Sequence, residues 1–140
     1  MNPSYTDTAT IKLTIPDPCD PPTSITPSNP ADQTYTISDN PYTYTVAPFT
    51  IVPSFCQVDY VATKTDLSDG SSAVTIQSSQ LDFYIDYISS LVPVINGEEQ
   101  TMTITATSKT KWASTPSSPV TASTDWVLDF LNPCIDTNFV

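Results

Sequence analysis

The sequence predicts an all-β protein: one sandwich of two sheets, built from seven to nine short strands, with an extra strand at the N-terminus. Segments in which apolar and polar residues alternate recur along the whole chain. Proline and turn-forming residues interrupt these segments at short intervals. The extra strand is predicted by a third observation, because one strand pattern occurs near both ends of the chain.

The duplicated pattern is an alternating strand that ends at Pro-Cys. It reads Ile11-Lys-Leu-Thr-Ile-Pro-Asp-Pro-Cys19 near the N-terminus and Trp126-Val-Leu-Asp-Phe-Leu-Asn-Pro-Cys134 near the C-terminus. Because proline cannot donate a hydrogen bond to a sheet, each copy ends there. A single domain needs such a closing strand once. The chain therefore looks like a unit cut from a head-to-tail array, or like a subunit that joins into one.

Residues 1–16 are predicted to form the N-terminal donor-type strand, with Ile11, Leu13 and Ile15 on one face. Residues 17–32 follow as a stiff, extended connector, because proline recurs through them. The sandwich is predicted over 33–134, and 135–140 form a C-terminal tail.

Within the sandwich, alternation predicts strands at 33–38, 42–46, 49–52, 58–63, 73–77, 81–87, 101–107 and about 121–131. Turn-forming residues separate several of them, namely Asp39-Asn-Pro41, Asp69-Gly70 and Asn96-Gly97. We expect most of the buried area to come from 81–87, 102–106 and 126–130, whose alternate residues are large and apolar.

Composition and charge limit the function classes. The chain has 140 residues, which suits one domain with its own core. It has no His and a formal net charge of −11, with 4 Lys and Arg against 15 Asp and Glu. These residues cannot form a cationic face for nucleic acid, and anionic membrane surfaces are disfavoured for the same reason. The sequence contains no apolar run of transmembrane length.

The motifs, taken in order, resemble a known family. They are Asp17-Pro-Cys19 after a closing strand, a Pro/Ser/Thr connector, Gln33-Thr-Tyr-Thr-Ile, Tyr42–Pro48, a Cys before an alternating strand, Leu67-Ser-Asp-Gly70, Thr103-Ile-Thr-Ala-Thr107 and Asn132-Pro-Cys134. This order is similar to the immunoglobulin/cadherin-like repeats strung in tandem in large surface proteins of single-celled eukaryotes. The resemblance covers residues 8–136. It implies an immunoglobulin-like sandwich, a structural and adhesive role, and a disulfide between Cys19 and Cys56.

Three cysteines leave one without a partner in the chain. Cys19 and Cys134 are equivalent in the duplicated pattern, so either can pair with Cys56. If the implied pairing holds, Cys134 is either an unpaired thiol or forms a covalent bond between subunits. No zinc-ligand spacing is present. Cysteines beside strand ends in a Ser- and Thr-rich chain favour an extracellular location, either secreted or at the cell surface.

The N-terminal strand has two interpretations. In the first, the chain is a slice of a longer tandem polypeptide, and residues 8–15 remain from the preceding domain. In the second, the chain is a free subunit whose residues 8–15 pair with a neighbour, because their backbone groups need partners and 126–130 already closes their own domain. Strand addition between identical chains propagates head to tail. It predicts a structural subunit of an extracellular filament, with Ile11, Leu13 and Ile15 at the interface.

The alternative function is a calcium- or glycan-binding adhesion repeat of a longer cell-surface protein. Acidic residues in turns and connectors offer oxygen ligands for Ca²⁺, but the pattern favours solvated surface carboxylates and turn formers. These residues are Asp17, Asp20, Asp66, Asp69, Glu98 and Glu99. Tyr84 with Tyr42 or Tyr44 is a candidate patch for stacking on carbohydrate. The alternative is that these tyrosines form ordinary side-chain pairs on a sheet surface. The Pro-containing Ser/Thr segments 21–27 and 114–119 are candidates for O-linked glycans.

An enzyme is not expected. The absence of His excludes Ser-His and Cys-His nucleophiles, and 2 Gly are too few for a phosphate-binding loop. Asp82 and Asp86 share one strand face about 13 Å apart, which exceeds the carboxylate separation of glycosidases. No cofactor is expected apart from the Ca²⁺ of the alternative.

Overall fold

The computed structural model describes residues 4, 6–22, 24–37, 39–68, 70–86, 98–110 and 119–133. Within these ranges the chain is all-β, with nine strands. They are β1 (Ser24–Thr26), β2 (Gln33–Thr36), β3 (Tyr42–Thr45), β4 (Thr50–Val52), β5 (Val58–Lys64), β6 (Val74–Ile76), β7 (Asp82–Ile85), β8 (Glu99–Ser108) and β9 (Thr121–Leu131). The described residues contain no helix that is long and apolar enough to cross a membrane.

The largest sheet has four strands in the order β2-β9-β8-β5. β8 and β9 form its long antiparallel ladder, from Glu99 opposite Asp129 to Thr107 opposite Thr121. β8 is a strand because Thr alternates with apolar residues along it, and these residues suit a pleated, half-buried surface. β2 is parallel to β9 and pairs only with Leu128–Leu131.

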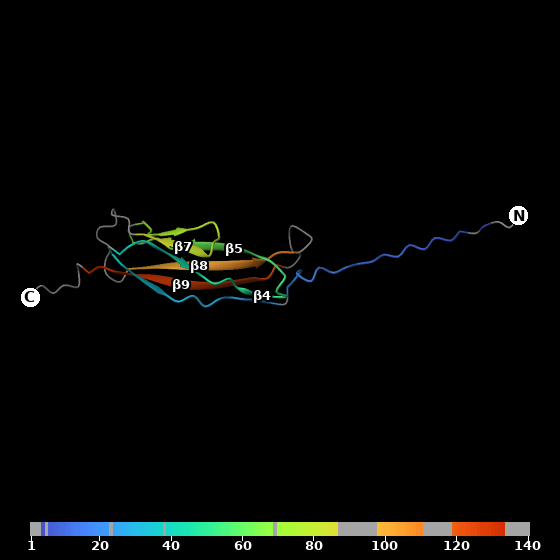
Figure 1. The fold of residues 1–140 in the computed structure, drawn as a ribbon, viewed down its shortest axis with the longest axis horizontal. Helices are drawn as coiled ribbons and strands as arrows, with labels where there is room; N and C mark the ends of the chain where they lie inside the picture. The colour runs from blue at the N-terminus through green and yellow to red at the C-terminus, as the bar shows by residue number, and fades with distance from the viewer. Residues whose placement is uncertain are drawn as a thin grey trace, which may run out of the picture.

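The remaining strands form a three-stranded sheet, β3-β7-β6, and a two-stranded pair, β1-β4. They lie against the four-stranded sheet and give a sandwich-like body (Figure 1). The two layers meet in one core, where the Phe83 ring of β7 lies edge-on to Trp126 of β9, with 5.1 Å between ring centroids. The fold class predicted from alternation, all-β with two packed sheets, agrees with this arrangement.

The core is built largely from the three segments predicted to supply it. Their fully buried side chains are Phe83, Ile85, Met102, Ile104, Ala106, Trp126, Leu128 and Phe130. Two polar residues, Gln100 and Ser108, are also buried, and Gln100 lies among these side chains at 0% exposure. Its side chain accepts from the Ala73 amide at 3.1 Å and donates to the Thr65 carbonyl at 2.8 Å, so the polar atoms have partners.

The predicted strands are confirmed with small shifts at their ends. The connector over 17–32 contains β1, and β8 begins at Glu99, inside a region predicted as a loop. Gly70, in a predicted turn, has a positive φ of 79°, and its amide donates to the Leu67 carbonyl at 2.9 Å to close the turn. The predicted bend Asn96-Gly97, residues 114–118 of the segment 114–119 and the tail 135–140 lie outside the described residues.

The two ends of the sandwich carry different parts of the chain. β5 and β9 both begin at one end, beside Ser108 and Thr107 of β8, and the N-terminal segment leaves the body there (Figure 1). β9 finishes at the other end, where Thr36 of β2 pairs with Leu131 and the chain turns toward β3.

Candidate functional site

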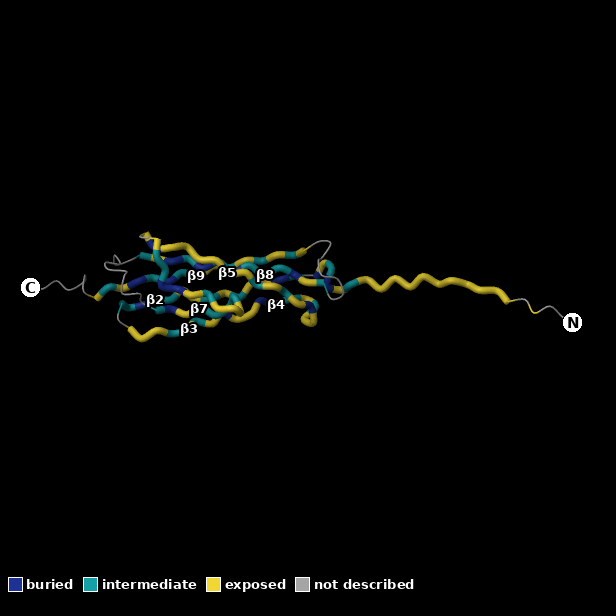
Figure 2. Tube along the Cα trace, turned by 90° about the horizontal axis from the view of Figure 1, so that it is seen from above, coloured by how far each residue is buried: buried dark blue, intermediate teal, exposed yellow. Residues whose placement is uncertain are grey.

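The N-terminal segment lies outside the sandwich. Every residue from 6 to 16 is exposed, and none belongs to a strand of the described chain. Figure 2 shows the segment as an exposed extension that points away from the body. Ile11 is 88% exposed, Leu13 79% and Ile15 66%, so the described residues do not cover the predicted interface residues.

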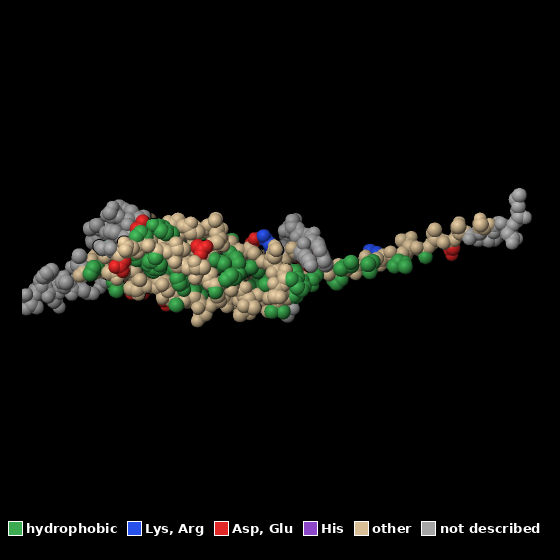
Figure 3. All heavy atoms as spheres, viewed as in Figure 1, with side chains coloured by type: hydrophobic (Ala, Val, Ile, Leu, Met, Phe, Trp, Pro, Cys, Tyr) green, Lys and Arg blue, Asp and Glu red, His purple; other side chains and the backbone are tan. Residues whose placement is uncertain are grey.

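The pattern of this segment makes it incomplete as an isolated strand. Successive side chains of an extended strand alternate between two faces, so Ile11, Leu13 and Ile15 form one apolar edge. Figure 3 shows hydrophobic atoms along the segment. Burying each of these side chains is worth roughly 1.5–3 kcal/mol. The backbone N–H and C=O groups also need partners wherever the strand becomes buried.

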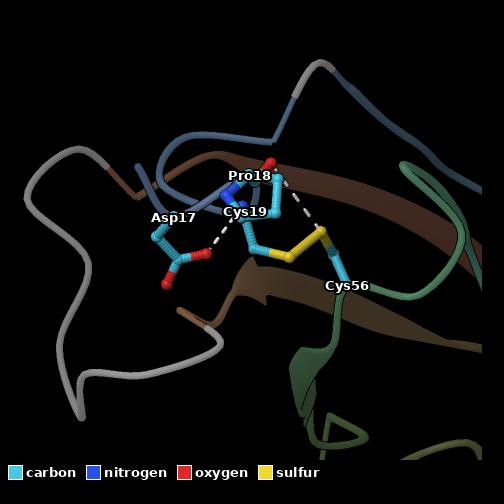
Figure 4. The surroundings of a disulfide bond; sticks show 4 residues. All are labelled: Asp17, Pro18, Cys19 and Cys56. Carbon is cyan, nitrogen blue, oxygen red and sulfur yellow. Dashed lines mark hydrogen bonds between the residues drawn. A yellow bond between two sulfur atoms is a disulfide. The ribbon is translucent and has the colours of Figure 1, made fainter. Parts of the chain in front are cut away.

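A disulfide fixes the point where the segment joins the body. Cys19 is bonded to Cys56, with 5.6 Å between their Cα atoms (Figure 4). The Cys19 amide donates to Asp17 Oδ1 at 2.8 Å, which closes a tight turn beside the bond. The pairing implied by the family resemblance is therefore confirmed. Cys134 lies outside the described residues, so its role between subunits stays a prediction.

Pro16 and Pro18 lie between the apolar segment and this disulfide. Each ring fixes its own φ, and each disfavours helical backbone at the residue before it. The root of the segment is therefore stiff and extended, which favours a direction away from the body over folding back. From residue 6 to residue 16 an extended chain spans about 33 Å at about 3.3 Å per residue.

The acidic residues considered for calcium are not brought together. Among the described residues, no group of three His, Cys, Asp or Glu side chains is arranged to hold a metal ion. Two of these carboxylates hold turns instead. Asp17 accepts from the Cys19 amide, and Glu98 Oε1 accepts from the Ser68 amide at 3.0 Å. Asp69 lies outside the described residues.

Asp82 has a structural set of contacts. Its carboxylate accepts hydrogen bonds from Thr45 Oγ1 at 2.6 Å and from Ser79 Oγ at 2.8 Å. The bond from Thr45 and then the bond from Ser79 lower the pKa of the Asp82 carboxyl. These contacts join the β3 and β7 strands and stabilise the turn before β7.

The predicted carbohydrate patch is not formed, because its tyrosines lie on opposite faces. Tyr84 pairs with Thr43 on the outer face of the β3-β7-β6 sheet. Tyr42 and Tyr44 lie opposite Ile85 and Phe83 and point into the sandwich, where both pack against the core. Burial, and then the neighbouring Tyr35 and Tyr44, raise the pKa of Tyr42.

Sequence patterns missed the side chains that occupy sheet edges. Gln80 and Asp32 each accept a hydrogen bond from a strand amide, and Lys64 donates to a strand carbonyl. These are single polar residues at turns and strand ends, and no periodic signal distinguishes them from other surface residues.

Comparisons of the chain with protein-family models, with curated protein sequences and with solved structures gave no match.

Proposed function

We propose that the protein is the structural subunit of an extracellular filament, which assembles head to tail when the N-terminal strand of one copy joins a sheet of the next. The observation that carries the proposal is the exposure of Ile11, Leu13 and Ile15 on a stiff segment outside the body. An extended segment with one apolar edge is a typical donor for strand addition, because main-chain bonds give affinity and alternate side chains give specificity.

The strand order supports an immunoglobulin-like domain that is complete without this segment. β5, β8 and β9 correspond to immunoglobulin strands C, F and G, and β3, β7 and β6 to B, E and D. The first strand of such a domain corresponds to β1 and β2, which are divided between the two layers. Because the domain has its own first and last strands, residues 8–15 are surplus to it and available to a neighbour.

The placement of the segment supports a filament rather than a closed dimer. The segment leaves the end of the body where β9 begins, and the opposite end carries the turn between β2 and β3. A contact between two different surfaces is heterologous, and it repeats indefinitely unless the rotation closes a ring. The Cys19–Cys56 bond anchors the segment covalently to the start of β5, so tension along the filament reaches the sandwich through a covalent bond.

No arrangement of the described residues favours the alternative, a calcium- or glycan-binding adhesion repeat. The disulfide agrees with an extracellular setting, because such bonds persist in oxidising compartments. O-linked glycans on the Pro-containing Ser/Thr segments remain part of the proposal as a surface modification and have no role in strand addition.

The test compares two triple variants of the full chain under oxidising conditions. Ile11→Ser, Leu13→Ser and Ile15→Ser together remove the apolar edge, and Thr10→Ser, Lys12→Ser and Thr14→Ser change the opposite face as a matched control. Losing three buried side chains weakens association by at least about 4.5 kcal/mol, or about three orders of magnitude. Negative-stain electron microscopy and sedimentation velocity should show filaments for the wild type and the control, and monomers for the apolar-edge variant. Filaments from that variant, or a monomeric wild type, would contradict the proposal.

A further inference from the structure

A donor strand needs a sheet edge whose backbone groups are not already bonded. The sandwich has two lateral sides, each bordered by one strand edge from each layer. β5 and β6 are the edge strands on one side. On the other side β2 is the edge strand of the four-stranded sheet and covers the last residues of β9, while β3 is the edge strand of the three-stranded sheet and the β1-β4 pair forms a sheet of its own. The edges differ in how many of their outward backbone groups already have a hydrogen-bond partner, and this difference helps to identify the edge that accepts the donor strand.

Side chains bond to one residue on each of the β5 and β6 edges. The Ala62 amide of β5 donates to Gln80 Oε1 at 3.0 Å. In β6 the Val74 amide donates to Ser72 Oγ at 3.1 Å, and the Val74 carbonyl accepts from Lys64 Nζ. Edges that carry such contacts, with a lysine among them, are protected against pairing with another strand.

The first strand of the domain covers the other side only in part. β1 pairs with β4 through Thr50–Val52, and β2 pairs with β9 through Leu128–Leu131. Between these two strands the chain crosses from one layer to the other. Two stretches therefore have a strand on one side only within the described residues: β3 over Tyr42–Thr45, which pairs with β7, and β9 over Thr121–Val127, which pairs with β8.

The register shows which amides of β3 face outward. The Val46 amide donates to the Leu81 carbonyl at 2.9 Å, so the even-numbered residues of β3 bond to β7. Thr43 and Thr45 therefore direct their N–H and C=O groups away from the sheet. In the part of the chain that the structure describes, the amides of these two threonines have no acceptor.

The open stretch of β9 is similar but partly occupied. The Phe130 amide donates to the Glu98 carbonyl at 3.0 Å, so the even-numbered residues of β9 bond to β8 and the odd-numbered ones face outward. The Val127 amide is one of these, and it donates to Asp32 Oδ1 at 2.8 Å. The outward amides of Thr121, Ser123 and Asp125 remain without an acceptor among the described residues.

Position along the sandwich decides between β3 and β9. Ile15 is four residues from Cys19, which is fixed to the body, so the apolar edge reaches only the near half of the next copy. In a head-to-tail arrangement that near half contains the turn between β2 and β3. β3 begins there, whereas Thr121–Val127 of β9 lies in the far half.

The direction and the side chains also suit β3. Residues 11–15 run toward their own body, whereas β3 runs from the contacting end into the sandwich, so the two segments meet antiparallel. Tyr42 and Tyr44 are half-buried on the inner side of β3, so part of each side chain stays accessible, and the Tyr44 hydroxyl donates to the Ala31 carbonyl at 3.0 Å. Ile11, Leu13 and Ile15 would cover these rings. Lys12 would then lie on the outer face, which carries the exposed carboxylate of Asp82.

We propose that residues 11–15 of one copy pair antiparallel with Tyr42–Thr45 of the next copy and lie end to end with its β1. This inference rests on the proposed function and names the edge that accepts the strand. It excludes the β5, β6 and β9 edges as the acceptor.

A pair of proline variants of the full chain tests the assignment. Proline is tolerated on an edge strand where its missing N–H faces solvent, and it removes the donor that an added strand needs. Thr43→Pro should abolish filaments, whereas Ser123→Pro, at an outward amide of β9, should leave them as in the wild type. Thermal melting of both variants checks that the sandwich persists.

Hydrogen exchange on unmodified filaments gives a second readout that does not depend on the folding of a variant. Relative to the monomeric apolar-edge variant, the Thr43 and Thr45 amides should exchange roughly a hundredfold more slowly in filaments, with Ser123 and Asp125 unchanged. Filaments from folded Thr43→Pro, loss of filaments in both proline variants, or protection at Ser123 instead would overturn the β3 assignment while the filament proposal stands. A wild type without filaments would instead overturn the proposed function.

Discussion

Two segments of this chain have the same pattern and opposite environments. Leu13 is 79% exposed, whereas its counterpart Leu128 is 0% exposed. Ile11 and Ile15 are likewise exposed, while Trp126 and Phe130 are among the most buried residues. Alternation therefore specifies that a strand has one apolar face, but it does not specify which molecule covers that face.

The difference comes from what lies beside each segment. The strand around Leu128 has β8 on one side and β2 on the other, and the opposite layer covers its apolar face. The segment around Leu13 has neither neighbour among the described residues, and prolines at its root direct it away from the body. We infer that the segment around Leu13 makes, with another copy of the chain, the same kind of contact that the strand around Leu128 makes within its own domain.

The largest expected effect comes from truncating the paired leucines. Leu128→Ala should lower the free energy of unfolding by roughly 3–5 kcal/mol, because it removes buried methyl groups and leaves a cavity. Leu13→Ala should leave the free energy of unfolding of the monomer unchanged, because the side chain is already in water. Urea unfolding followed by tryptophan fluorescence, under conditions that keep both proteins monomeric, measures both values. Equal destabilisation by the two substitutions would show that Leu13 contacts its own sandwich.

The next effect concerns the bond that joins the exposed segment to the body. Replacing Cys19 and Cys56 together by Ser should lower the free energy of unfolding by roughly 2–4 kcal/mol, because the bond restrains a long loop of the unfolded chain. Reductant should produce a similar loss in the wild type. The double variant serves as the control, since reductant should not change its midpoint further. A wild type that is insensitive to complete reduction would show that the bond contributes nothing to stability.

Much of the fold follows from the sequence because the strands alternate regularly. Phe83, Ile104 and Trp126 could be assigned to the core from periodicity alone, since the faces of a strand repeat every two residues. The Cys19–Cys56 pairing could not be derived in the same way, because Cys134 is equivalent in the pattern. It required the family resemblance.

The acceptor edge could not be predicted at all. Which amide of β3 faces outward depends on register with β7, and which edges are closed depends on single residues such as Gln80 and Asp32. Alternation showed that Tyr42 and Tyr44 lie on the same face of their strand. It did not show whether Tyr84, on another strand, lies on that face of the sheet, because the pattern within one strand does not specify which face is turned to the core. Tertiary pairing supplies that information.

The smallest expected effect concerns the backbone of the buried segment. The Val127 amide donates to the carboxylate of Asp32, whereas the equivalent amide of Lys12 has no acceptor among the described residues. Asp32→Ala should lower the free energy of unfolding by about 0.5–1.5 kcal/mol, the usual net value of one hydrogen bond, because the Val127 amide then relies on water. Asp32→Asn is the matched control, since its side-chain oxygen still accepts and should retain most of that value. Faster exchange of the Val127 amide in Asp32→Ala than in Asp32→Asn would identify the lost hydrogen bond as the cause. Equal stability and exchange in the two variants would show that this edge of β9 is held by β2 alone.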